Sequence, residues 1–101
     1  QRPKQAPSTG SSWHLYVIQV PHNHHSEIFD YLKRAGIGVN VHYIPIHTQP
    51  YYRRMGFKLG QFPNAESYYR KSISIPLYFG LTEKDQDQVC ATLEQSLFNV
   101  T

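Results

Sequence analysis

Apolar and polar residues fall into blocks that predict three strands. The run WHLYVIQV at residues 13–20 is rich in β-branched and aromatic residues and is followed by a proline, which predicts a strand. Its odd and its even positions are both largely apolar, so we expect a central strand with both faces covered. Residues 37–44 (IGVNVHYI) alternate and predict a second strand, and residues 72–77 (SISIPL) predict a short third one.

Helical patterns lie between these strands and after them. Ser26 is a suitable cap for a helix that begins at Glu27 and carries an apolar stripe. Gly36 follows that stripe, at the position where a helix usually ends in a positive φ. Asn64 is a suitable cap for a short helix over residues 65–71.

The last helix is predicted over residues 83–98. The sequence TEKD at residues 82–85 has the form of a capping box. Five apolar residues are expected on or beside its inward face: Val89, Cys90, Leu93, Leu97 and Phe98. The order of strands and helices predicts an α/β (α+β) fold, with a small three-stranded sheet and helices mainly on one face.

Two segments lack a clear period. Residues 1–12 contain prolines, serines and a glycine and predict a linker or arm that precedes a domain over residues 13–101. Residues 45–63 form a stretch of about 19 residues that is long for a loop in a compact domain, and its aromatic content argues against disorder. Such loops are usually functional.

Composition narrows the classes of protein. One cysteine excludes a disulfide framework within the chain. The apolar runs are too short to span a membrane, and residues 1–12 lack the apolar core of a signal peptide, so we expect a cytoplasmic protein. Ten Lys and Arg against seven Asp and Glu give a net charge of +3, which does not predict nucleic-acid binding. Because the first residue is not Met, the chain is expected to be a piece of a longer protein.

Candidate chemistry concentrates in residues 42–52, HYIPIHTQPYY, at a strand end and in the loop behind it. Imidazole, phenol and amide groups recognise sugar hydroxyls by hydrogen bonding and stacking. The alternative is that these rings only pack a structured loop. The histidine spacings match no metal site, the acids are expected mostly on helix surfaces, and Cys90 is expected inside, so neither metal nor nucleophilic chemistry is predicted.

Several motifs together resemble a known family. They are SWHLYVI at residues 12–18, AGIGVNVHYIP at residues 35–45, HTQPYY at residues 47–52, PNAE at residues 63–66 and SIPL at residues 74–77. This set resembles the C-terminal part of the DegT/DnrJ/EryC1/StrS sugar aminotransferases. Within that family it is most similar to the branch that aminates a UDP-4-keto sugar in pseudaminic acid biosynthesis.

The resemblance implies the C-terminal small domain of a fold-type I, pyridoxal-phosphate-dependent transferase. Such enzymes are homodimers that move an amino group, commonly from glutamate, to a 4-keto-6-deoxy nucleotide sugar. By resemblance, five residues would line the substrate pocket: His42, Tyr43, His47, Gln49 and Tyr52.

The resemblance also implies what this chain lacks. The family's Schiff-base lysine lies in the large domain, and none of the lysines here has a matching context. We therefore expect no catalytic residue and no bound pyridoxal phosphate in this chain, and no activity of the chain alone. The alternative is a stand-alone small α/β module that binds or assembles without catalysis.

Overall fold

The computed structural model describes residues 1–101 and contains a two-stranded antiparallel sheet. Strand β1 (Tyr16–Gln19) pairs with β2 (Ser72–Ile75), with Tyr16 opposite Ile75 and Gln19 opposite Ser72. The predicted strand over residues 37–44 forms only an isolated bridge, from Asn40 to Ser74. The predicted mixed fold with a small sheet is confirmed, but the sheet has two strands and one bridge instead of three strands.

The middle position in this sheet belongs to β2. It has β1 on one side and Asn40 on the other, and its first three residues are buried. The prediction that the first strand is central is wrong. On its other side β1 meets only the chain's beginning, where the amino group and carbonyl of Gln1 bond to the Gln19 backbone at 2.6 and 2.9 Å.

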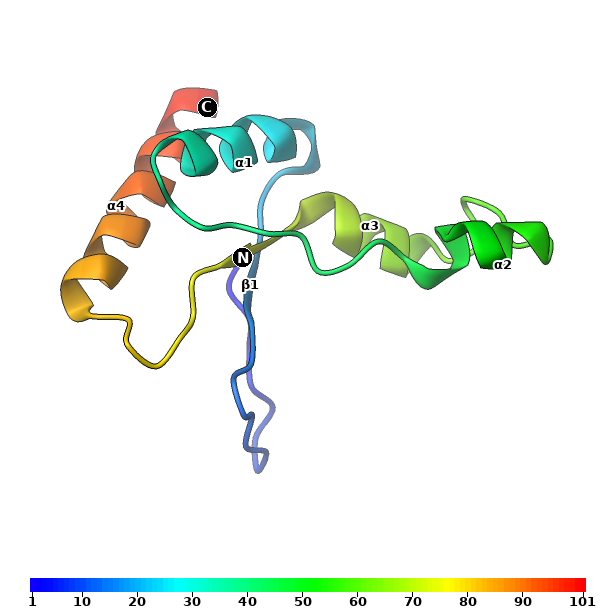
Figure 1. Ribbon diagram of the computed structural model, residues 1–101, viewed down its shortest axis with the longest axis horizontal. Coiled ribbons are helices and arrows are strands. Elements are labelled where there is room, and N and C mark those ends of the chain that lie inside the picture. The colour runs from blue at the N-terminus through cyan, green and yellow to red at the C-terminus, as the bar shows by residue number, and fades with distance from the viewer.

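Helices α1 (His25–Arg34) and α4 (Glu83–Val100) lie side by side against the sheet (Figure 1). The core between them is small and consists of seven buried residues: Ile18, Val20, Ile28, Leu32, Ile37, Ile73 and Val89. Helix α3 (Pro63–Lys71) leads into β2, and the short helix α2 (Pro50–Arg54) lies beyond it, so these two extend away from the core (Figure 1).

Helix ends follow the predictions in part. The capping box of α4 is present: Thr82 Oγ1 accepts from the Asp85 N–H, and Asp85 Oδ2 accepts from the Thr82 N–H. Gly36 has φ +82°, as expected after α1. Ser26 and Asn64 are not caps. A 3₁₀ turn (His22–His24) leads directly into α1, and a proline begins α3, so each predicted cap lies inside its helix.

One expectation about α4 is wrong. Val89 and Ser96 are buried, and Leu93 and Leu97 pack against the core, but Cys90 and Phe98 are exposed. Each helical residue turns by about 100°, so the residue after an inward position points aside. None of the helices combines the length and apolarity that a membrane crossing requires.

The two segments without a period differ from each other. Residues 45–63 contain a 3₁₀ turn (Ile46–Thr48) and α2, so the predicted loop is in part helical. Residues 1–15 contain neither helix nor strand: they begin beside β1, turn at residues 7–8 and run back into β1 (Figure 1).

The molecule is open for its size. Its radius of gyration is 15.6 Å, whereas a compact domain of this length has about 13 Å. Its accessible surface is 7708 Å², against about 5900 Å² for a compact monomer of the same mass. Only 12 of the 101 residues are buried. Much apolar surface is therefore left without a partner in this chain.

Candidate functional site

A hollow of about 600 Å³ lies between the segment that follows the Asn40 bridge and helices α2 and α3. Aromatic and aliphatic side chains and one imidazole line it: Tyr43, Ile44, Pro45, Ile46, His47, Tyr52, Phe57, Phe62, Ala65 and Tyr68. Apolar walls with a few polar groups are typical of ligand sites. The sequence places the hollow here because the extended segment ends at Pro45 and the chain then turns back through α2.

His42 is held beside this hollow by the sheet. Its Nδ1 lies 2.7 Å from the hydroxyl oxygen of Ser74, the residue of β2 that also bridges to Asn40. The His42 ring is half-buried and meets the ring of Tyr43 edge-on at 4.6 Å. Tyr43 itself lines the hollow and is 69% exposed, so it is open to a ligand.

His47 is built into the wall of the hollow. It is only 8% exposed, and its ring lies 4.8 Å from that of Phe62. Its Nε2 lies 3.3 Å from Glu66 Oε2. That distance is within ion-pair range, but Nε2 has no hydrogen bond of good geometry. The contact is therefore mainly electrostatic.

Glu66, in the first turn of α3, is a buried carboxylate with several donors around it. Both of its oxygens lie 2.9 Å from the Gly60 N, and Oε2 also accepts from the Phe62 N–H at 3.3 Å. The Gly60 N–H holds the pKa of the Glu66 carboxyl below its ordinary value of 4.5, and His47 and Phe62 act in the same direction against the effect of burial. Glu66 is therefore ionised at neutral pH.

Tyr52 and Gln49 have different positions. Tyr52 lines the hollow from α2, with the rings of Tyr51 and Phe57 edge-on at 5.2 and 6.1 Å. Gln49 precedes α2, where its carbonyl accepts from the Arg53 N–H. The Gln49 side chain is exposed and is not part of the lining.

Three of the five residues predicted to bind substrate therefore line one hollow: Tyr43, His47 and Tyr52. His42 borders it through Tyr43, and Gln49 stands outside. The sequence patterns did not indicate Phe57, Phe62 and Tyr68 as wall residues, or Glu66 as the buried acceptor of the Gly60 and Phe62 N–H groups. The PNAE motif was the available signal, because an acid in the first turn of a helix can accept from the loop before it.

The hollow contains no group that could bind pyridoxal phosphate covalently. None of the five lysines lines it: Lys4, Lys33, Lys58, Lys71 and Lys84. The residues present therefore do not fit the cofactor. No three His, Cys, Asp or Glu side chains come together as a metal site.

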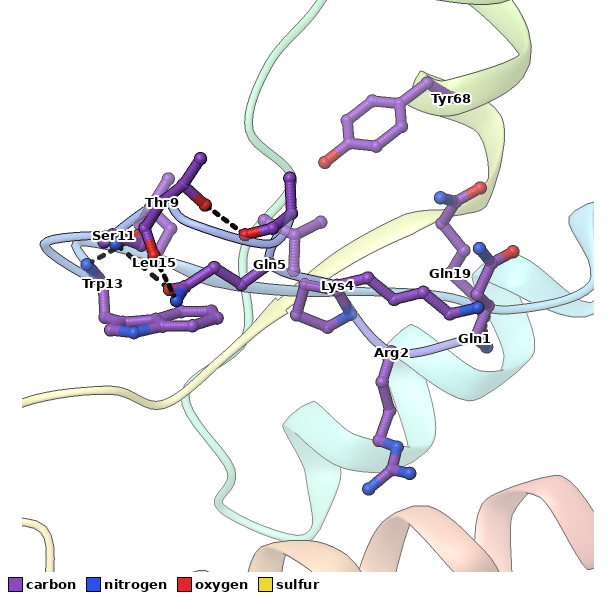
Figure 2. Close-up of a pocket in the computed structure, with 14 residues that line it drawn as sticks. Gln1, Arg2, Lys4, Gln5, Thr9, Ser11, Trp13, Leu15, Gln19 and Tyr68 are labelled. Carbon is purple, nitrogen blue, oxygen red and sulfur yellow. Dashed lines mark hydrogen bonds between the residues drawn. The ribbon is translucent and has the colours of Figure 1, made fainter.

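A second hollow of about 610 Å³ lies between the N-terminal arm and β1. Figure 2 shows Gln5 bonded to the arm's own backbone at Thr9 and Ser11, and Tyr68 facing the arm from α3. Its walls come mostly from exposed residues of the N-terminal segment before β1, and none of the five predicted site residues lines it. We therefore assign the candidate site to the aromatic hollow.

Comparison with known proteins places this geometry in context. The chain is 43% identical over 84 residues to the spore coat polysaccharide biosynthesis protein SpsC of Bacillus subtilis, a match that covers 77% of this chain and 22% of SpsC. The chain thus spans about a fifth of the length of that relative.

Solved structures show the same fold. The PLP-form of the putative sugar aminotransferase Spr1654 from Streptococcus pneumoniae matches 99% of this chain with 26% of its own, at a TM-score of 0.90 and 28% identity. Helicobacter pylori PseC, an aminotransferase involved in the biosynthesis of pseudoaminic acid, matches 88% of this chain with 24% of its own, at a TM-score of 0.79 and 26% identity.

The family model of the DegT/DnrJ/EryC1/StrS aminotransferases matches residues 1–94, nearly the whole chain. With its small antiparallel sheet, its helical layer and its aromatic hollow, the chain belongs to the DegT/DnrJ/EryC1/StrS aminotransferase family.

Proposed function

We propose that this chain is the small domain of a pyridoxal-phosphate-dependent nucleotide-sugar aminotransferase and forms one wall of its sugar site. The observation that carries the proposal is the aromatic hollow, in which Tyr43, His47 and Tyr52 meet in a chain of this family. Tyrosine rings stack against the apolar faces of sugars, and imidazoles hydrogen-bond hydroxyls.

The roles of the wall residues follow from their positions. Tyr43 and Tyr52 offer exposed rings for stacking. His42 is oriented by Ser74 and His47 by Glu66, so both imidazoles are held in place before a ligand arrives. Gln49, at the exposed start of α2, would reach a substrate only when another part of the enzyme covers this face.

Amino transfer requires a lysine that binds the cofactor, and this chain offers none at the hollow. We infer that the chain alone transfers no amino group and that the lysine belongs to a large domain of the same enzyme. The unpartnered apolar surface supports such a partner. The homodimer, the glutamate donor and a cytoplasmic location stay predictions.

We propose a UDP-4-keto-6-deoxy sugar as the substrate, as in pseudaminic acid biosynthesis. The involvement of H. pylori PseC in the biosynthesis of pseudoaminic acid and the HYIPIHTQPYY sequence support this choice. The likeness to SpsC supports the broader class of enzymes that build surface polysaccharides.

A chimera tests the proposal. The matching C-terminal segment of H. pylori PseC would be replaced by this chain, and amino transfer from glutamate to a UDP-4-keto-6-deoxy-N-acetylhexosamine would be followed by mass spectrometry. We expect transfer by the chimera and none by the 101-residue chain with added pyridoxal phosphate. A correctly folded, cofactor-bound chimera that transfers nothing would contradict the proposal.

The second candidate is a stand-alone binding module, which the absence of a lysine at the hollow favours. Such a module would bind UDP-N-acetylglucosamine by itself and would fail to restore amino transfer in the chimera. Isothermal titration of the chain, together with the chimera assay, separates the two functions.

A further inference from the structure

The two ring nitrogens of His47 have different surroundings. Nε2 is buried and faces Glu66 Oε2 at 3.3 Å, and no other partner lies on it. Nδ1 makes no hydrogen bond, yet it is not among the buried unpartnered atoms, so it retains access to solvent. His47 also lines the hollow. A neutral imidazole carries its proton on one nitrogen and accepts a hydrogen bond on the other, so the surroundings decide which nitrogen carries the proton.

The carboxylate of Glu66 favours the His47 tautomer that carries its proton on Nε2. This carboxylate already accepts from Gly60 and Phe62, and these donors keep it ionised. An ionised carboxylate accepts hydrogen bonds and donates none. A lone pair of Nε2 facing this buried anion would be repelled, whereas an Nε2–H group is attracted to it.

We propose that Glu66 is a positioning residue that fixes His47 as the Nε2–H tautomer and thereby presents Nδ1 to the hollow as a hydrogen-bond acceptor. The assignment rests on the proposed function, because it takes the hollow as the sugar site. It also predicts the specificity of the site at this position. His47 Nδ1 accepts a hydrogen bond from a donor of the substrate, namely a sugar hydroxyl or an acylamino N–H. A keto or phosphate oxygen, which can only accept, is disfavoured there.

The test is nitrogen-15 NMR of the 101-residue chain at about pH 8, above the ordinary titration range of histidine. The shifts of the two ring nitrogens report directly which one carries the proton. We expect His47 to be the Nε2–H tautomer. In Glu66→Gln, the amide that faces Nε2 carries no negative charge, so the preference for a proton on Nε2 weakens and the population of the Nδ1–H tautomer rises.

Glu94→Gln is the matched control, since Glu94 is an exposed acid on α4. We expect it to leave the His47 tautomer unchanged. In Glu66→Gln the Gly60 amide should also exchange with solvent about tenfold faster or more, because a hydrogen bond to a charged acceptor is lost. The control should leave that rate unchanged.

An Nδ1–H tautomer in the unmodified chain overturns the assignment, and so does an unchanged Nε2–H population in folded Glu66→Gln. If that variant does not fold, the tautomer of the unmodified chain still decides. The measurement needs no substrate. A failed chimera together with an Nε2–H tautomer therefore rejects the proposed function and leaves the role of Glu66 standing.

Discussion

At the scale of single residues, the site depends on polar groups of the interior that hold its two imidazoles. Ser74 is only 5% exposed, and its hydroxyl lies 2.7 Å from His42 Nδ1. Its backbone also bridges to Asn40. Ser74 thus fixes both the backbone path of the segment that enters the hollow and the orientation of the His42 ring.

Ser74→Ala should destabilise the chain by about 1 kcal/mol, because His42 loses the partner of a half-buried ring nitrogen. Urea unfolding followed by circular dichroism measures this change. Ser12→Ala, at an exposed position of the arm, should leave the unfolding midpoint unchanged. Equal midpoints for the two variants would show that the contact adds no stability.

Glu66 makes stability depend on pH in a defined direction. Because its pKa in the folded chain is below the ordinary 4.5, it stabilises the fold fully above that value. This contribution is lost as the pH falls below 4.5 through the folded pKa. The urea midpoint should therefore fall across this window, and by less in Glu66→Gln. A Glu66→Gln profile parallel to that of the unmodified chain below pH 4.5 would contradict the assignment.

At the scale of elements, local hydrogen bonding fixes a helix end where the sequence carries a complete capping motif. The capping box before α4 forms as its sequence predicts, with Thr82 and Asp85 bonded reciprocally. Ser26 and Asn64 have equally suitable side chains, but a tertiary contact accompanies the earlier start of α1 and Pro63 begins α3. His25 bonds to the Ser72 carbonyl at 2.8 Å and draws the start of α1 toward β2.

Thr82→Ala should lower stability by about 1 kcal/mol, the usual cost of removing a helix cap. Thermal unfolding measures this effect. The control is Thr92→Ala in the middle of α4, where the hydroxyl bonds only to the Gln88 carbonyl. We expect the control to be neutral or slightly stabilising, since Ala favours a helix. A control that is as destabilising as Thr82→Ala would remove capping as the cause.

At the scale of the whole molecule, the chain exposes more surface than a compact domain of its mass. The accessible area exceeds that of a compact monomer by roughly a third. Exposed apolar side chains of residues 43–62 contribute to it, and Leu59 among them is 75% exposed. Such surface favours association with a large domain or, in its absence, with other copies of the chain.

The isolated chain should therefore self-associate as its concentration rises. Sedimentation velocity should show dimers or larger species at high concentration, and Leu59→Ser, outside the lining of the hollow, should shift them toward monomer. Lys58→Ser, a polar neighbour, is the control and should leave the distribution unchanged. A clean monomer at high concentration would contradict the expectation.

The sequence by itself determined the features that depend on neighbouring residues or on a short motif. Period and capping chemistry predicted the last helix, the turn at Gly36 and the mixed fold, because these depend on residues a few positions apart. The HYIPIHTQPYY and PNAE motifs indicated the family that the comparisons show. They also indicated the part of the chain that carries the aromatic hollow.

Only the tertiary structure decided which strand lies in the middle, because apolar composition cannot distinguish a strand covered by neighbours from one beside an open edge. It also decided that Cys90 is exposed and that Glu66 is buried beneath the hollow. Burial of a carboxylate depends on donors from a turn, at Gly60 and Phe62, and on the electrostatic contact with His47, nineteen positions away. Those groups meet only once α3 has folded back on the segment after Pro45, and the sequence pattern does not contain that contact.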